Sequence, residues 1–196
     1  MPPHGAGQKI GLFGGSFDPA HEGHRRVSLE ALRRLGLDQL WWVVTPGNPL
    51  KDTHALPPLD TRMQEAAAAA AHPRIVITGM EAELRTRFTA DLIQALTAKF
   101  PATRFVWIMG SDNLAQFHRW DRWRDIAETI PMAVVNRPGA LAAALSGPAA
   151  QALASHRIDE ADAASLADKS PPAWIFLNGP RSAASSTALR TGSKTS

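Results

Sequence analysis

The sequence predicts a doubly wound α/β fold, in which a parallel sheet carries helices on both faces of a single domain. Two observations support this prediction. Short apolar runs alternate with segments of helical periodicity along most of the chain, and such alternation favours parallel strands joined by right-handed helical crossovers. The unusual residues also concentrate directly after the apolar runs, and ligands of such folds bind at the carboxyl ends of the strands.

The expected elements follow from this alternation. Apolar runs predict strands at residues 9–13, 39–45, 74–78, 104–109, 132–136 and 174–177. Helices are expected at residues 22–35, 59–71, 89–99, 112–118 and 122–129, the third of them capped by Thr89. The stretch 138–167, rich in Ala, Gly, Pro and Ser, is expected to form a helix flanked by a flexible insertion. Core packing is the expected role of Trp41, Trp42, Trp107, Trp123 and Trp174.

The composition bounds the class of protein. The chain has 196 residues, 44% of them hydrophobic and 20% charged, which suits one well-buried globular core. It has no apolar run long enough to span a membrane, no signal-type apolar segment after Met1 and no cysteine, so we expect a cytoplasmic protein. The net charge of +3 comes from basic residues spread along the chain, which suits a phosphorylated small molecule better than nucleic acid.

Two histidines lie three residues apart where the first strand passes into the first helix. At this spacing His21 and His24 share one side of the first helical turn, where unpaired N–H groups and the helix dipole favour an anion. We therefore expect a phosphate site. A zinc site is less favoured because zinc proteases space their histidines four apart, as H-E-x-x-H. A purely structural pair is the other alternative.

The loop before the histidines is rich in small residues. Gly14 and Gly15 let the main chain approach a ligand closely, and Ser16 and Phe17 would present further N–H groups to a phosphate. Two familiar phosphate motifs are excluded, because the sequence lacks G-x-x-x-x-G-K-[ST] and this loop does not form G-x-G-x-x-G.

Two segments carry a resemblance to a known superfamily. Residues 15–24, GSFDPAHEGH, resemble the first signature of the HxGH nucleotidyltransferases, and residues 185–190, SSTALR, resemble the second. The resemblance narrows to the bacterial nicotinate-nucleotide adenylyltransferases through four further segments: PGNPLK at 46–51, FTAD at 88–91, IMGSDNLAQFHRW at 108–120 and VNRPG at 135–139. It covers residues 9–190 and leaves residues 191–196 as an expected disordered tail.

The resemblance implies a Rossmann-like fold and a specific reaction. Adenylyl transfer from ATP to nicotinate mononucleotide would give deamido-NAD and pyrophosphate, a step of NAD biosynthesis. His24 would hydrogen-bond the α-phosphate as charge builds in the transition state, and His21 would hold the same or the neighbouring phosphate. Magnesium would be held mainly by the ATP phosphates, with few or no protein ligands.

The remaining site residues are also assigned by the resemblance. Lys51 and Arg190 would grip the triphosphate and the leaving pyrophosphate, with Ser186 and Thr187 adding donors at a helix start. For Lys51 and Arg190, the alternative is an ordinary charged side chain that is solvated at the surface.

The mononucleotide would meet a second group of residues. Trp120 would stack on the pyridine ring, Thr89 would help to recognise its carboxylate, and packing or capping is the alternative for each. Asp112 would accept from ribose hydroxyls, or else cap its helix. Arg137 could contact a phosphate of either substrate.

Other functions stay open at this point. A related enzyme could transfer the adenylyl group to phosphopantetheine instead. The chain ends six residues after Arg190, and a helix that short is marginal without tertiary contacts, so a nucleotide-binding protein with impaired turnover is an alternative. A nucleic-acid-binding module is less favoured. The sequence does not decide the oligomeric state.

Overall fold

All six expected strands are present in a computed structural model of the chain, which describes residues 2–47, 56–137 and 141–178. They run parallel in one sheet of order β3-β2-β1-β4-β5-β6. The strands are β1 (Lys9–Gly15), β2 (Gln39–Val44), β3 (Ile75–Thr78), β4 (Arg104–Gly110), β5 (Met132–Val135) and β6 (Trp174–Leu177). The strand order reverses between β1 and β4, which is where a doubly wound fold opens a crevice for a ligand.

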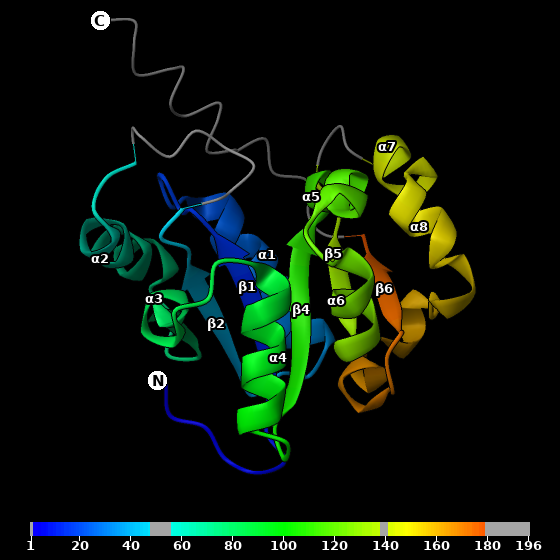
Figure 1. Cartoon of the computed structure of the whole chain (residues 1–196), viewed down its shortest axis with the longest axis horizontal. Coiled ribbons are helices and arrows are strands. Elements are labelled where there is room, and N and C mark those ends of the chain that lie inside the picture. The colour runs from blue at the N-terminus through cyan, green and yellow to red at the C-terminus, as the bar shows by residue number, and fades with distance from the viewer. Residues whose placement is uncertain (1, 48–55, 138–140, 179–196) are drawn as a thin grey trace, which may run out of the picture.

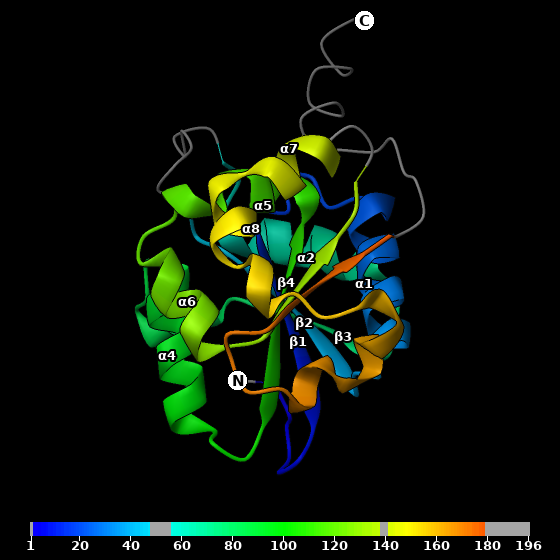
Figure 2. The same ribbon diagram turned by 90° about the vertical axis from the view of Figure 1, so that its right-hand side faces the viewer.

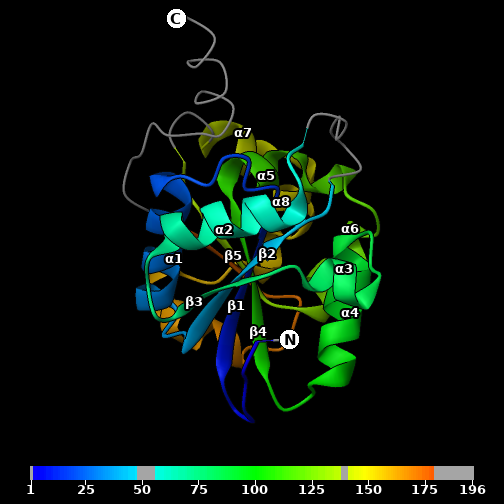
Figure 3. The same cartoon turned by 90° about the vertical axis from the view of Figure 1, so that its left-hand side faces the viewer.

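The helices cover both faces of the sheet, so the predicted fold class is confirmed. In Figure 1, α4 and α6 lie in front of the sheet, α5 lies beyond the tip of β4, and α1 lies behind the sheet. Figure 2 and Figure 3 show the same layers from the two sides. The helices are α1 (Glu22–Arg34), α2 (Leu59–Ala70), α3 (Met80–Leu84), α4 (Thr89–Lys99), α5 (Ser111–Gln116), α6 (Trp123–Thr129), α7 (Leu141–Ser146) and α8 (Pro148–Ala152), with 3-10 turns η1 (Phe117–Arg119), η2 (Ala154–His156) and η3 (Glu160–Asp168).

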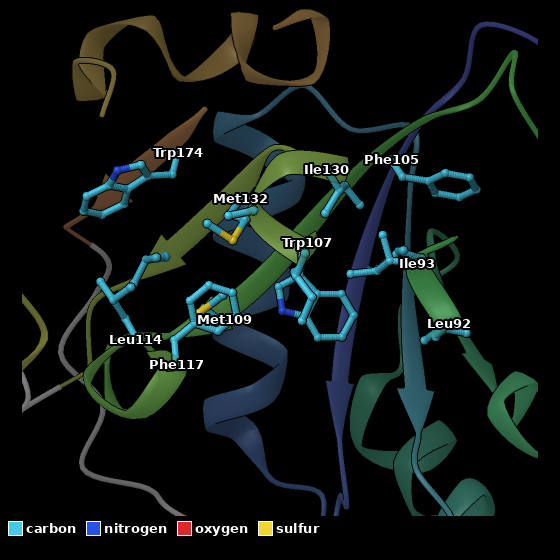
Figure 4. Packing of buried hydrophobic residues seen from close by; sticks show 14 of the residues in the cluster. Leu92, Ile93, Phe105, Trp107, Met109, Leu114, Phe117, Ile130, Met132 and Trp174 are labelled. Atoms are coloured by element: carbon cyan, nitrogen blue, oxygen red, sulfur yellow. The ribbon is translucent and has the colours of Figure 1, made fainter. Parts of the chain in front are cut away.

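Alternation along the strands divides the core into two layers. In β4, Trp107 and Met109 point to the layer under α4, α5 and α6, whereas Val106 and Ile108 point to the layer under α1, α2 and η3. Figure 4 shows the first layer, with Trp107 at its centre among Met109, Met132 and Ile93. The predicted core role is confirmed for Trp41, Trp42, Trp107 and Trp174, while Trp123 is only partly buried against the first layer.

Two local predictions were wrong, and one short helix was missed. Thr89 is the first helical residue of α4, and Phe88 takes the cap position without a side-chain cap. From Leu141 on, the stretch forms several short elements instead of one helix, because Gly147 lies between α7 and α8, Pro148 is the first residue of α8, and Asp159 accepts from Ala161 N at 2.8 Å to start η3. The short helix α3 was not expected at all.

Within the described ranges, no helix is long and apolar enough to cross a membrane.

Candidate active site

The end of β1 and the loop that leads to α1 are closely packed against aromatic rings. A Cβ on Gly14 would lie 2.7 Å from the Trp107 ring, so a larger residue here would displace the indole. Phe17 has a left-handed backbone with φ of 48°, and its ring stacks on Trp42 at 4.7 Å between centroids. The main chain of this segment is thus held in one conformation by side chains of both core layers.

The two histidines form the cap of α1 with their own side chains. His21 is the N-cap residue, and its Nδ1 accepts from Gly23 N at 3.0 Å. The Nδ1 of His24 accepts from His21 N at 3.2 Å. Since each Nδ1 accepts, each neutral ring carries its proton on Nε2. The rings lie 3.9 Å apart between centroids, and the shared side predicted from their spacing is confirmed.

Electrostatics keeps both rings neutral. Burial lowers the pKa of His24 to about 2, helped by His21 and by the positive charge of Arg137. Burial and Arg137 also lower the pKa of His21. The Nε2 of His21 is buried without a hydrogen-bond partner in the described part of the chain. Two neutral N–H donors, one of them unpaired, fit the oxygens of a bound anion.

The same donors fit a metal ion poorly. A metal ligand must offer a lone pair, and here Nδ1 accepts a main-chain N–H while Nε2 carries the proton. In the ranges that the structure describes, no three His, Cys, Asp or Glu side chains form a group that could hold a metal ion. The histidine pair therefore matches the phosphate interpretation.

Arg137 and Asp112 meet across the end of β4. The Arg137 guanidinium lies 3.5 Å from the Asp112 carboxylate, and both side chains pass directly over Gly110, where a Cβ would contact them. The buried Ser111 hydroxyl accepts from Arg137 N at 2.9 Å and joins the ends of β4 and β5. Because Gly110 is the cap residue of α5 and Asp112 makes no cap hydrogen bond, the capping alternative for Asp112 was wrong.

Trp120 and α4, which begins at Thr89, pack against the first core layer, on the face of the sheet opposite α1. Trp120 is partly buried and meets the ring of Phe117 edge-on at 5.4 Å and that of Trp107 at 6.3 Å. An ion pair between Asp91 and Arg122 joins the first turn of α4 to the segment after Trp120. These two of the four predicted mononucleotide residues thus stand on elements that an ion pair joins.

Comparisons with known proteins decide the family. The cytidylyltransferase-like family model matches residues 12–192. A protein of Methylorubrum extorquens named "Probable nicotinate-nucleotide adenylyltransferase" is 58% identical over 183 residues, which are 93% of this chain and 99% of that protein. A protein of Rhizobium meliloti with the same name is 55% identical and is covered to 96%. The chain belongs to the nicotinate-nucleotide adenylyltransferases of the cytidylyltransferase-like family.

A solved structure shows the same fold as this adenylyltransferase. Nicotinic acid mononucleotide adenylyltransferase of Plasmodium falciparum, complexed with APC, matches with a TM-score of 0.68 over 94% of this chain and 83% of that one. The sequence identity is 19%. A second structure of the same protein, complexed with NaAD, matches equally well.

Two buried charged residues of this enzyme were missed from the sequence. Arg62 of α2 and Glu81 of α3 are buried, and both lie near Thr45, where β2 ends. Burial raises the pKa of Glu81 to about 7, and a hydrogen bond from the Thr45 hydroxyl opposes this rise. The Thr45 hydroxyl also lies 3.0 Å from the Gly47 carbonyl oxygen, and it can donate its one proton to either Glu81 or Gly47 but not to both. Arg62 shares a helix face with Ala66 and Ala70, at four-residue spacing, and that position is the signal that could have revealed it.

Four predicted residues lie outside the described part of the adenylyltransferase chain: Lys51, Ser186, Thr187 and Arg190.

Proposed function

We propose that this protein transfers the adenylyl group of ATP to nicotinate mononucleotide, giving deamido-NAD and pyrophosphate in NAD biosynthesis. One observation carries the proposal. In a chain that is 58% identical to a relative named as a nicotinate-nucleotide adenylyltransferase, two neutral histidines present Nε2–H donors beside Arg137, after the first strand at the sheet's switch point. Such donors suit the α-phosphate of a nucleotide.

The reaction needs alignment and charge stabilisation more than acid or base chemistry. An oxygen of the mononucleotide phosphate attacks the α-phosphorus of ATP, the bond from that phosphorus to the bridging oxygen breaks, and pyrophosphate leaves with the electron pair. The attacking oxygen is already deprotonated at neutral pH. Neutral histidines therefore suffice, because each needs only to donate a hydrogen bond.

His24 donates from Nε2 to the α-phosphate in this proposal, and His21 donates to the same or the neighbouring phosphate. Both rings are held by main-chain N–H groups on Nδ1 before substrate binds, so little reorganisation is needed. Arg137 adds positive charge beside them. Gly14, Gly15, Ser16 and Phe17 line the loop that would meet the phosphates.

The other roles stay predictions for the same reaction. Lys51, Ser186, Thr187 and Arg190 would hold the triphosphate and the leaving pyrophosphate. Trp120 would stack on the pyridine ring, Thr89 would contribute to recognition of its carboxylate, and Asp112 would accept from ribose hydroxyls.

A divalent cation, which we take to be Mg²⁺, would be bound by ATP oxygens and water. The residues present fit this arrangement, since the histidines are donors and the described residues form no acidic metal cluster. When bound, the cation neutralises charge on the phosphates during transfer.

The test is a comparison of acceptors. Purified protein is incubated with ATP, Mg²⁺ and either nicotinate mononucleotide, nicotinamide mononucleotide or phosphopantetheine, and both the dinucleotide product and pyrophosphate are quantified. We expect equimolar deamido-NAD and pyrophosphate, formed fastest with the nicotinate acceptor and abolished by EDTA until Mg²⁺ is restored. ATP binding by calorimetry without pyrophosphate release would contradict the proposal and favour a binding protein.

A further inference from the structure

Arg62 is a buried cation whose hydrogen bonds converge on main-chain carbonyls. Its side chain is 1% exposed. The Nη1 donates to Ser16 O and to Thr45 O, both at 2.8 Å, and the Nε donates to Pro57 O at 3.0 Å. The Nη2 lies 3.4 Å from Pro46 O. Burying a guanidinium is costly unless its donors are satisfied, so this position demands an explanation beyond packing.

The carbonyls belong to the two loops that lead to the phosphate site. Ser16 lies between β1 and His21, whereas Thr45 and Pro46 begin the loop that follows β2. Thr45 N also donates to Gly15 O at 3.0 Å. The fork of the guanidinium can satisfy acceptors on several segments at once. Arg62 thereby joins the first turn of α2 to both loops at the carboxyl edge of the sheet.

A chain of contacts runs from Arg62 to His24. The Ser16 carbonyl that Arg62 holds belongs to the peptide group just before Phe17, the residue with a φ of 48°. Because a trans peptide is planar, fixing this carbonyl also fixes the direction of the Phe17 N–H. The centroid of the Phe17 ring lies 4.9 Å from that of the His24 ring, and the Phe17 ring also stacks on Trp42.

The main chain of His24 is also held by hydrogen bonds. Trp42 Nε1 donates to the Ser28 hydroxyl at 2.7 Å, and that hydroxyl donates to His24 O at 2.8 Å. A shift of the Phe17 backbone would therefore reach His24 through the contact between the two rings.

We propose that Arg62 is a positioning residue for the reaction, which sets the Ser16–Phe17 peptide and, through the Phe17 ring, the placement of His24 relative to Thr45 and Pro46 after β2. The inference rests on the proposed function. The expected effect is specific to catalysis, because loss of Arg62 would reduce the rate of the chemical step and not merely the amount of folded protein. Misplacement by about 1 Å can cost roughly 100-fold in rate.

The experiment compares Arg62→Ala and Arg62→Lys with a core variant from the other edge of the sheet. Ile130→Ala removes a buried side chain just before β5, at the amino edge, and is expected to lower stability while leaving kcat unchanged. For Arg62→Ala we expect kcat to fall on the order of 100-fold per folded molecule, with a smaller change in KM for ATP. The kcat of Arg62→Lys should lie between those of the wild type and Arg62→Ala, since lysine keeps the charge but lacks the forked guanidinium.

Two readouts separate positioning from stability. Millimolar guanidinium should partly restore kcat in Arg62→Ala and should do nothing for the wild type or Ile130→Ala. In histidine NMR spectra, the ring signals of His24 should shift in both Arg62 variants and stay unchanged in Ile130→Ala.

The proposal is overturned if Arg62→Ala keeps its kcat when folded, or if its loss is no greater than that of Ile130→Ala and the His24 signals do not move. If the wild type itself forms no dinucleotide, the proposed function fails. The His24 signals still decide the role of Arg62 in that case.

Discussion

The two edges of the sheet are built from different kinds of interaction. At the carboxyl edge, polar side chains are buried: His21, His24, Arg62, Thr78, Glu81 and Ser111 all lie in or just after the ends of strands or in the first turns of helices there. At the amino edge, the ion pairs of Asp168 with Lys9 and Arg104 are partly to largely exposed to solvent. Buried polar groups must be satisfied by defined partners, so the carboxyl edge is the region where function constrains structure.

The largest expected effect comes from His24. His24→Ala removes the Nε2–H donor, and we expect kcat to fall roughly 10³-fold. Affinity for ATP should change little, since the donor acts most strongly on charge that develops in the transition state. Steady-state assays and calorimetry on the same preparation measure the two quantities, and wild-type turnover would reject the assigned role.

Glu81 should make stability depend on pH. Its folded pKa of about 7 lies above the ordinary value of 4.5, so the folded state binds more protons than the unfolded state between these values. Stability contributed by the protonated form is therefore complete below about pH 4.5 and is lost as pH rises to about 7, by up to about 3 kcal/mol.

The control for this prediction is Glu81→Gln, which cannot titrate. Urea unfolding at several pH values should show that the free energy of unfolding depends less steeply on pH in the variant than in the wild type. An equal slope in both proteins would mean that another group causes it.

A smaller effect is expected at Thr89, in the first turn of α4. Thr89→Val keeps the shape and removes the hydroxyl. We expect KM for nicotinate mononucleotide to rise by roughly 10-fold, the lower end of the value of one lost hydrogen bond to a charged group, while KM for ATP stays unchanged. Equal changes in both constants would argue against a role in carboxylate recognition.

The smallest effect belongs to the amino edge. Asp168→Ala removes the exposed partner of Lys9 and Arg104, and exposed ion pairs contribute little. The midpoint of urea unfolding should shift less than for any change at Glu81, and turnover should equal that of the wild type. A loss of turnover in Asp168→Ala would contradict the difference in function between the two edges of the sheet.

Most of the fold could be predicted because the strands are buried on both faces. Strands such as β2 and β4 appear in the sequence as continuous apolar runs, and the helices between them have clear periodicity. The five residues of α3 carry no such period. The cap of α4 was misplaced by one residue, since Phe88 and not Thr89 holds the extended conformation before the helix.

The site could be predicted only where a local motif marks it. His21 and His24 stand out by their spacing, and their neighbours in the loop stand out by composition. Arg62 depends on carbonyls from residues 16 and 45, which no local pattern connects. The burial that raises the pKa of Glu81 likewise comes from the fold and leaves no trace in the sequence around it.

The central claim is that two neutral histidines offer Nε2–H donors to the phosphates of ATP. Nitrogen-15 NMR of the histidine rings tests it most directly, followed from pH 8 to pH 4 with and without a non-hydrolysable ATP analogue. His24 should stay neutral with its proton on Nε2 across this range in the free protein, because burial holds its pKa at about 2, and the Nε2 signals of both rings should shift when the analogue binds. A His24 ring that takes up a proton near pH 6, or that carries its proton on Nδ1, would contradict the account.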